Sequence, residues 1–543
     1  MLKYDARYLE FYLMDFKFGG GEFKSYEGMP HVSHLLSDGL DKSVVLEVMR
    51  ELERKMIERG KMIEQYKKLS VYNAHHPENP LPHIVLVVDE ASLLFQISNN
   101  KESKLQNEIN RILGYIATQG RSQGVTFCFA TQTFAGADIP TNILRNITNR
   151  FLLKCESADA DRLIERNGAS INESLTQGYT YMSASQKIAR VFDYNYVDGG
   201  VNMLNKYREA ICSGNSRPAG RNNFVYNGKA SRAYSTADME FIKSKRQPSL
   251  LLGSGVTVKQ EPVSLSFRKD MGENLLITGV NGEMQSERVF FNAVMSMCEW
   301  VAASNKRVNV ICFDNYNDGD ENYTRYEQLN SIKNVNFVSV LNGRSRDNMI
   351  ADLGRKIRNN SIGDEIYILA LLGHERYRRN MANPLSQETP QANTVAPAAN
   401  SGRSRYMPVE ESRSPLNMIN IGSVASSPMS SVKSDSSNVE EELIYILNYG
   451  PENGVHTIMH VDRPSSITPV SDKWSRREIQ RTFKYVVALN LNSSEVSKLP
   501  AMEDISIETL TADNERLRAV YYDDENNKAL LFTPFDFNKN FGV

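Results

Sequence analysis

Residues 84–90 read IVLVVDE, a run of five apolar and mostly β-branched residues that leads directly into two adjacent carboxylates. Such a run predicts a strand that is buried on both faces of a parallel sheet. Ligands of open parallel sheets bind at the carboxyl ends of the strands, which is where Asp89 and Glu90 fall. Two interpretations follow: a buried strand that meets a polar loop, or a nucleotide-hydrolysis site with one acid for a metal ion and one for water. The rest of the chain decides between them.

The segments around this strand alternate between strand and helix patterns. We expect a strand at 8–17, a helix with i,i+4 charge pairs at 41–69 and a polar helix near 101–120. Further strands are expected at 124–132 and 150–157. This alternation predicts an α/β fold in which helices cover a mostly parallel sheet.

The second half of the chain repeats the landmarks of the first half in the same order. The segment 308–316 is a predicted strand that ends at Asp314, as the strand at 8–17 ends at Asp15. Two further pairs of segments correspond: 454–466 with 124–136, and 481–495 with 149–161. Both halves then finish in a predicted hairpin. The sequence therefore predicts two tandem copies of one α/β unit.

The length of 543 residues allows two to four domains. We place the first unit at 1–200, an interdomain connector rich in Ser, Asn, Arg and Lys at 201–245, and the second unit at 246–543. Residues from about 379 to 438 are rich in Pro, Ser and Asn. They hold too little apolar surface to order themselves, so we expect a disordered insertion there.

Composition excludes several classes of protein. The formal net charge of -2 argues against a globally basic nucleic-acid binder, although a local basic groove remains open. The five cysteines are scattered without a C-x-x-C pair, which favours a reducing compartment over a zinc site or a disulfide framework. The sequence shows neither a membrane-spanning stretch nor a signal-peptide pattern. We expect a cytoplasmic chain without membrane contact of its own, with any membrane association made through segments upstream.

The second unit contains a strand, a turn and a helix at 273–295, where a phosphate-binding P-loop would stand. The motif G-x-x-x-x-G-K-[ST] uses glycines for close backbone approach, Lys for charge and a hydroxyl for Mg²⁺. Gly279 and Ser286 occupy the outer positions, but Met284 and Gln285 replace the second Gly and the Lys. The strand that corresponds to the one before Asp89 ends on Leu372-Gly373, without a carboxylate. These losses predict a degenerate second unit with a structural role.

The first unit has the acidic pair but no strand, P-loop and helix ahead of residue 8. We therefore expect residue 1 to lie inside a domain, so that the chain is a C-terminal part of a longer protein or a truncated relative. Because neither unit contains a P-loop lysine, we expect negligible ATP turnover by residues 1–543 alone.

Several sequence blocks resemble, in order and spacing, those of the FtsK/SpoIIIE family. They cover most of residues 8–195 and, more faintly, the second unit: MDFKFGG (14–20), MPHV (29–32), LPHIVLVVDE (81–90), GRSQGVTFCFATQ (120–132) and ITNRFLLKCESADADRLI (147–164). This family comprises RecA-like hexameric motors that pump double-stranded DNA and a branch that drives type VII protein secretion. The resemblance implies two tandem RecA-like P-loop NTPase-type domains that use ATP and Mg²⁺ and assemble into a ring, expected to be a hexamer.

The resemblance also implies roles for particular residues. Asp89 would coordinate Mg²⁺, Glu90 would polarise the attacking water, and Gln132 would sense the γ-phosphate. Lys17 is a candidate for phosphate contact, with pairing to Asp15 as the alternative. A ring motor also needs a cation from the neighbouring subunit, and the sequence does not choose among Arg121, Arg145, Arg150 and Arg162, of which we take Arg150 as the candidate.

The sequence leaves three functions open, and the family resemblance favours the first of them. The first is an ATP-dependent DNA translocase, with double-stranded DNA as the partner, although no clear basic stripe is present. The second is a type VII secretion-like motor that moves protein substrates, because tandem units with a decayed distal site resemble that branch. The third is a non-catalytic interaction module.

Overall fold

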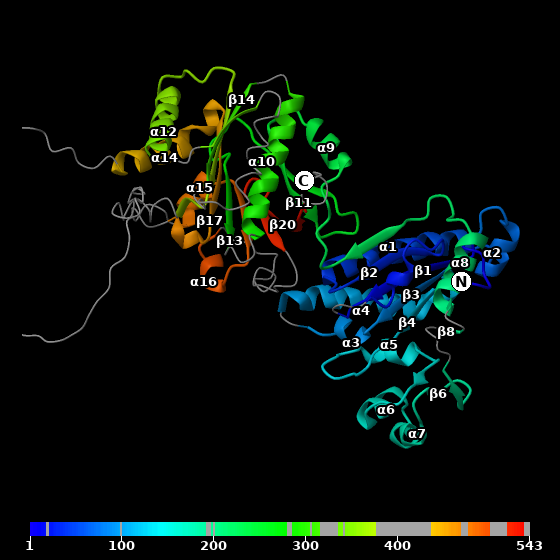
Figure 1. Cartoon of the computed structure of the whole chain (residues 1–543). Helices are drawn as coiled ribbons and strands as arrows, with labels where there is room; N and C mark the ends of the chain where they lie inside the picture. The colour runs from blue at the N-terminus through cyan, green and yellow to red at the C-terminus, as the bar shows by residue number, and fades with distance from the viewer. Residues whose placement is uncertain are drawn as a thin grey trace, which may run out of the picture.

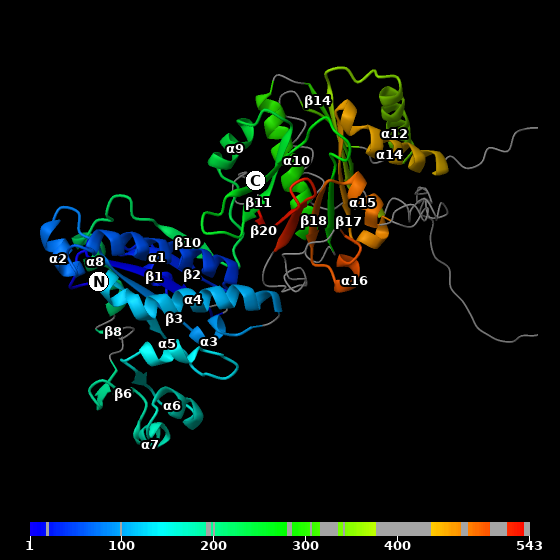
Figure 2. The same cartoon turned by 180° about the vertical axis from the view of Figure 1, so that it is seen from behind.

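The structure is a computed structural model that describes residues 1–17, 21–97, 100–191, 197–198, 201–279, 285–304, 307–314, 335–339, 343–375, 436–467, 476–499 and 518–536. The chain forms two α/β lobes, and a small third unit adjoins the first lobe (Figure 1, Figure 2). The insertion expected at about 379–438 lies outside the described residues except for its last positions, where a helix begins at Ser436.

The first lobe contains a five-stranded sheet in which every pair of neighbours is parallel. The order across the sheet is β10 (Phe224–Asn227), β2 (Val32–Ser37), β1 (Leu9–Asp15), β3 (His83–Asp89) and β4 (Val125–Phe129). In β3, Ile84, Leu86 and Val88 are buried, whereas Val85 and Val87 are only half-buried. The prediction that this strand is buried on both faces is therefore only partly right, because the second face is covered by a small cluster of Leu13, Met29, Val32 and Leu35, against which Val87 packs, and not by long helices.

Helices cover the remaining face of the first sheet and close a hydrophobic core with it. They are α1 (Lys42–Ile63), α3 (Ala91–Leu94), α4 (Asn100–Gln123) and α5 (Thr141–Asn146). The helix predicted over 41–69 ends early, because Lys67 has a left-handed backbone with φ of 60°. A separate helix α2 (Leu69–His75) follows, and a short 3-10 helix η1 (Lys24–Tyr26) precedes β2.

The third unit is a small antiparallel sheet of β5 (Phe151–Leu152), β6 (Tyr179–Met182) and β7 (Lys187–Arg190). Helices α6 (Ser157–Leu163) and α7 (Gly168–Ser174) cover one of its faces, where Leu152 is buried. The expectation that the strand at 150–157 belongs to the parallel sheet is wrong: β5 is two residues long and pairs with β6. A two-stranded ladder of β8 (Val197–Asp198) and β9 (Val201–Asn202) follows.

Residues 201–245, expected to be a connector, contribute structure to both lobes. Helix α8 (Met203–Gly214) precedes β10, which pairs with β2 at the edge of the first sheet. Helix α9 (Thr236–Lys243) packs against the second lobe and begins with a capping box between Ser235 and Asp238.

The second lobe is built on a ten-stranded sheet whose parallel part runs from β18 to β15. The order is β12 (Pro262–Ser266), β11 (Ser249–Gly255), β20 (Lys528–Pro534), β19 (Ala519–Asp523), β18 (Tyr485–Leu489), β13 (Leu275–Gly279), β17 (Val455–Val461), β16 (Ile366–Leu372), β14 (Val308–Asp314) and β15 (Val335–Ser339). Every residue of β13, β16 and β17 is buried, as expected for parallel strands covered on both faces.

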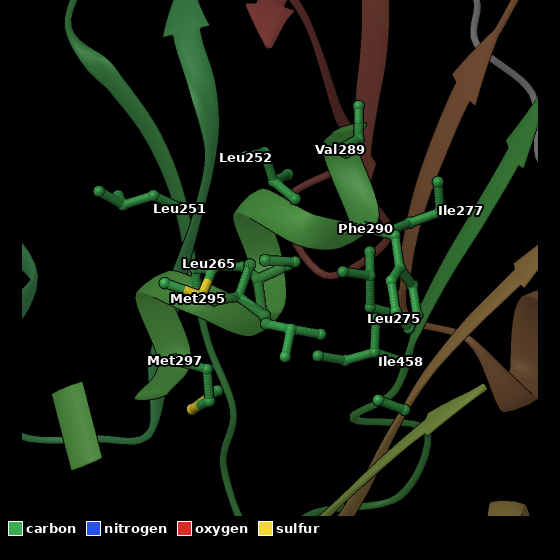
Figure 3. Packing of buried hydrophobic residues seen from close by; sticks show 14 of the residues in the cluster. Leu251, Leu252, Leu265, Leu275, Ile277, Val289, Phe290, Met295, Met297 and Ile458 are labelled. Carbon is green, nitrogen blue, oxygen red and sulfur yellow. The ribbon is translucent and has the colours of Figure 1, made fainter. Parts of the chain in front are cut away.

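Helices lie on both faces of the second sheet. One face is covered by α9 and α10 (Gln285–Ala303), whose packing is shown in Figure 3. The other face is covered by α12 (Gly343–Arg358), α14 (Ser436–Tyr449), α15 (Arg476–Thr482) and α16 (Ser493–Val496). Short 3-10 helices η4 (Pro451–Asn453) and η5 (Pro464–Ser466) flank β17.

The backbone confirms that the two lobes are copies of one unit. In the first lobe Asp15 pairs in register with Asp89, and in the second lobe Asp314 pairs with Leu372. The residue after each pair has a left-handed backbone, with φ of 52° at Glu90 and 61° at Gly373. The prediction of two tandem α/β units with mostly parallel sheets is therefore confirmed.

Candidate functional site

Three carboxylates meet at the carboxyl edge of the first sheet. Asp15 ends β1 and Asp89 ends β3, and the two are register partners in neighbouring parallel strands. Glu90 follows Asp89 directly. Because parallel neighbours end at the same edge of a sheet, the fold itself brings these side chains together.

Asp15 is fully buried. Its Oδ1 accepts a hydrogen bond from the backbone N–H of Lys17 at 3.0 Å, and within the described residues its Oδ2 has no partner. Burial raises the pKa of this carboxyl, and the nearby charge of Asp89 raises it further. A buried carboxylate oxygen that lacks a donor is costly, and a cation at this edge would remove that cost.

Asp89 is half-buried beside Asp15. Burial raises the pKa of Asp89, and the charge of Glu90 acts in the same direction. Lys17 opposes this effect electrostatically, although its side chain is exposed. Lys17 bonds to Asp15 only through its backbone N–H, at 3.0 Å. The ammonium group of Lys17 therefore stays a candidate for phosphate contact.

Glu90 is held by three hydrogen bonds to one oxygen. Its Oε1 accepts from Ser92 Oγ at 2.7 Å, from Thr131 Oγ1 at 2.7 Å and from the backbone N–H of Gln132 at 3.3 Å. Burial alone would raise the pKa of Glu90, but the bonds from Ser92 and Thr131 outweigh it and lower that pKa. The group is therefore an ionised and oriented acceptor at neutral pH, as a residue that positions water requires.

Ser92 and Thr131 were missed by the sequence reasoning. Thr131 directly precedes Gln132, which lies just beyond β4 with an exposed side chain. Ser92 stands two residues after Glu90. The spacing of these hydroxyls around the acidic pair was a usable signal, but Ser and Thr are too common in loops for it to stand out.

Arg150, taken as the candidate cation for a neighbouring subunit, is bound within its own unit. Its guanidinium donates to the carbonyl oxygens of Ile147 at 3.0 Å, Leu163 at 2.9 Å and Leu144 at 2.9 Å. These contacts give Arg150 a role in holding the chain between α5 and α6. Among the other candidates, Arg162 donates to two carbonyl oxygens, whereas Arg121 and Arg145 are exposed.

At the corresponding edge of the second lobe, the side chain of His460 bridges Gly373 and Ser286. The backbone N–H of Gly373 donates to His460 Nδ1 at 3.3 Å, so the Nε2 of this ring carries the hydrogen and faces Ser286 Oγ at 2.9 Å. Ser286 Oγ also donates to the carbonyl oxygen of Gly279 at 3.3 Å. The hydroxyl that a P-loop would direct at Mg²⁺ is thus bonded internally, while Met284 lies outside the described residues.

No group of three or more His, Cys, Asp or Glu side chains in the described ranges could hold a metal ion by itself. Mg²⁺ is commonly bound by one or two carboxylates together with phosphate oxygens and water. Asp89 and Asp15 could supply the one or two carboxylate ligands, while phosphate oxygens and water would supply the others. The residues present therefore suit a metal that arrives with a nucleotide.

Comparison with known proteins gives sequence relatives among secretion proteins. No family model matches the chain. It is 27% identical over 165 residues to the ESX secretion system protein EccC of Geobacillus thermodenitrificans. The aligned residues make up 29% of this chain and 10% of that protein. It is 26% identical over 171 residues to the ESX-5 secretion system protein EccC5 of Mycobacterium tuberculosis, covering 30% of this chain and 12% of the relative. The match thus spans about a tenth of the length of these relatives.

Solved structures share the fold over nearly the whole chain. The cytoplasmic domain of the type VII secretion ATPase EccC of Thermomonospora curvata gives a TM-score of 0.56 at 13% identity, over 98% of this chain and 57% of that one. ATPases 2 and 3 of EssC from Geobacillus thermodenitrificans give 0.50 at 13% identity, over 98% and 86%. At this identity the likeness establishes the tandem ATPase fold alone. Within the described ranges, none of the helices has the length and apolar character needed to span a bilayer.

Proposed function

We propose that this chain is part of a motor ATPase of the FtsK/SpoIIIE type that works in a type VII-like protein secretion system. The observation that carries the proposal is the acidic edge of Asp15, Asp89 and Glu90, in a tandem fold with sequence relatives among ESX secretion proteins. The first lobe supplies catalytic groups, and the second lobe, with His460 closing its edge, is non-catalytic.

Protein cargo now stands ahead of DNA. The family resemblance alone favours a DNA translocase over a secretion motor, whereas the comparisons favour the secretion motor. The sequence relatives are ESX secretion proteins, and one similar structure, EccC ATPases 2 and 3 of Thermomonospora curvata, is in complex with a signal sequence peptide. No comparable observation supports double-stranded DNA as the partner.

The residues of the first lobe divide the work in phosphoryl transfer, which is mostly positioning and charge stabilisation. Bound ATP with Mg²⁺ supplies a γ-phosphoryl group that water can attack. Asp89 and Asp15 would hold the cation, which would offset the charge of the phosphates, while Glu90 would accept a hydrogen bond from the water and so orient it. Gln132 is the sensor and Lys17 contacts phosphate, both at the same edge of the sheet. Ring assembly as a hexamer at the cytoplasmic side of a membrane belongs to the same proposal.

The test replaces Glu90 with Gln in the native locus of the source organism. Gln keeps the size of the side chain but removes the carboxylate that positions water. We expect the export of secreted proteins into the medium to fall by about 100-fold or more, as general acid–base groups typically contribute. The matched control is Glu173→Gln, a change at an exposed position outside the site.

Three outcomes separate the functions. Loss of export with Glu90→Gln and normal export with Glu173→Gln supports the secretion motor. Normal export together with defective chromosome segregation or DNA transfer would restore the DNA translocase. Normal export and normal DNA handling, with the altered protein present at its usual level, would favour a non-catalytic interaction module.

A further inference from the structure

Two carboxyl groups lie in contact at the carboxyl edge of the second lobe. Glu375 follows β16 and Asp462 follows β17, and these two strands are parallel neighbours. The backbone N–H of Asp462 donates to Glu375 Oε2 at 3.3 Å, and the carboxyl groups of the two residues lie within hydrogen-bond reach of each other. Ionised carboxylates only accept hydrogen bonds, so a contact between two of them is favourable only when one of the two carries a proton.

Glu375 is shielded from the water that would otherwise separate two like charges. The residue is 5% exposed. Its Oε1 is buried and accepts no hydrogen bond within the described ranges, which is costly for an ionised oxygen. Burial raises the pKa of Glu375, and the charge of Asp462 raises it further, from the ordinary 4.5 to about 7. Geometry and charge thus agree that the carboxyl of Glu375 keeps its proton until the pH approaches neutrality.

The nearby histidine of β17 does not supply a positive charge to this pair. His460 Nδ1 accepts the backbone N–H of Gly373, and a proton on Nδ1 would break that bond. The neutral ring therefore fits the bonds that it makes, and the charge that acts on Glu375 is that of Asp462. The other titratable or charged residues on the elements around the pair are His374 beside Glu375, the exposed Arg463 after β17, Glu287 at the start of α10 and Arg346 of α12.

The first lobe has uncharged residues at the corresponding positions. Counted from the first residues of the matching strands, Glu375 corresponds to Ser92 and Asp462 corresponds to Gln132. In the first lobe the hydroxyl of Ser92 and the backbone N–H of Gln132 both donate to Glu90. The second lobe thus has two acids where the first lobe has donors that bind an acid. The carboxyl pair is therefore a separate feature of the second lobe and not a remnant of the acidic edge of the first.

We propose that Glu375 and Asp462 form a proton-operated latch that holds the end of β16 to the segment that follows β17. With one proton between them, the two carboxyl groups are joined by a hydrogen bond. When that proton leaves, two negative charges are in contact at a buried position and repel each other. The segment after β17 then separates from the end of β16. The latch lies in the second lobe and does not depend on the proposed secretion function.

The direction of the pH effect follows from the raised pKa of Glu375. Because the folded pKa lies above the ordinary 4.5, the protonated group stabilises the fold fully below pH 4.5, and this contribution is lost as the pH rises through about 7. A shift of roughly 2.5 pKa units corresponds to a change of about 100-fold or more in the equilibrium constant for unfolding. The latch is therefore closed in mild acid and open in mild base.

The first test compares urea unfolding of the whole chain at pH 5 and pH 8 with that of Glu375→Gln. Gln keeps the size of the side chain and an oxygen for the N–H of Asp462, but it cannot ionise. We expect Glu375→Gln to be more stable than the unaltered protein at pH 8, with a gain that shrinks toward pH 5. A residue with only a packing role would not give such a gain, because replacing a buried side chain ordinarily destabilises a protein.

A partner variant and a local readout locate the effect. Asp462→Asn removes the same repulsion, so we expect a gain at pH 8 in the same direction. Glu452→Gln is the control, because Glu452 is exposed in η4, at the other end of β17, and this variant should keep the pH dependence of the unaltered protein. Hydrogen exchange of residues 455–467, corrected for its intrinsic pH dependence, should speed up by about tenfold or more from pH 6 to pH 8, and not in Glu375→Gln.

The proposal is overturned if Glu375→Gln lowers stability by the same amount at pH 5 and pH 8. Corrected exchange of residues 455–467 that does not change with pH in the unaltered protein also overturns it. If added Mg²⁺ or Ca²⁺ abolishes the pH dependence of the unaltered protein, a divalent cation and not a proton joins the two carboxyl groups, and the latch is rejected. None of these outcomes bears on Glu90, so the latch and the proposed secretion function fail separately.

Discussion

Glu90 and Gly373 occupy one position in two copies of a fold, and both have a left-handed backbone. For a residue with a side chain this conformation is strained, and such strain is found where function requires it. In the first lobe the conformation brings the carboxylate of Glu90 to Thr131 and Gln132. The second lobe keeps the backbone but has no side chain to direct, so it uses the residue that adopts this conformation without strain.

Replacing Gly373 with Ala tests this account of the backbone. We expect Gly373→Ala to lower the free energy of unfolding by about 1 kcal/mol, since an L-residue in the left-handed region carries that cost. Denaturant unfolding measures it. Gly21→Ala is the control, because a Cβ there meets nothing within 4 Å and its φ is not positive. Equal stability of the two variants would contradict the assignment of strain to this position.

Glu51 links the stability of the first lobe to pH. Its Oε2 lies 3.3 Å from His34 Nε2, and its Oε1 lies 3.1 Å from Lys55 Nζ. Burial would raise the pKa of Glu51, but His34 and Lys55 outweigh it and lower that pKa from the ordinary 4.5 to about 2. Because the folded pKa is depressed, the ionised group stabilises the fold above pH 4.5, and this contribution is lost as the pH falls toward 2.

The corresponding variant is Glu51→Gln. We expect it to lower the free energy of unfolding at pH 5 by about 3 kcal/mol, from a shift of roughly two pKa units, because the pairing with His34 requires a protonated imidazole. The difference from the unaltered protein should shrink as the pH falls from 4.5 to 2. Urea unfolding across that range is the measurement, with the exposed Glu173→Gln as the control. A difference that stays constant with pH would show that Glu51 acts through packing alone.

At the scale of elements, local patterns predicted what local forces determine. The apolar run before Asp89 predicted β3, and the strand end predicted the place of Asp89 and Glu90, because these features depend on residues close in sequence. The location of β5 failed for the opposite reason. A strand joins a sheet only beside a partner, and the partner of β18 in the second lobe is β13, which is distant in sequence. The end of α1 was likewise not predictable, because the left-handed backbone at Lys67 follows no sequence pattern that marks a lysine for that conformation.

At the scale of the whole molecule, the second lobe contacts the first lobe near the carboxyl edge of the first sheet, through apolar side chains and an ion pair. Val256 and Val258 of the second lobe belong to the hydrophobic core of the first lobe. Arg518, directly before β19, donates to Asp41 Oδ2 at 2.8 Å and to the carbonyl oxygen of Gly228 at 2.6 Å. Asp41 is the N-cap of α1, so a buried ion pair joins the second sheet to the helix that covers the first.

Arg518→Ala tests whether this contact makes the lobes unfold together. The arginine side chain is 5% exposed and that of Asp41 is 11% exposed, so the substitution leaves a nearly buried carboxylate without its cation. Breaking a buried pair in this way costs about 3–5 kcal/mol. Scanning calorimetry should therefore show a lower Tm and a split into two transitions, whereas Arg268→Ala, which removes an exposed pair with Glu525, should shift the Tm little. A single unshifted transition in Arg518→Ala would mean that the apolar contacts of Val256 and Val258 hold the lobes together without the ion pair.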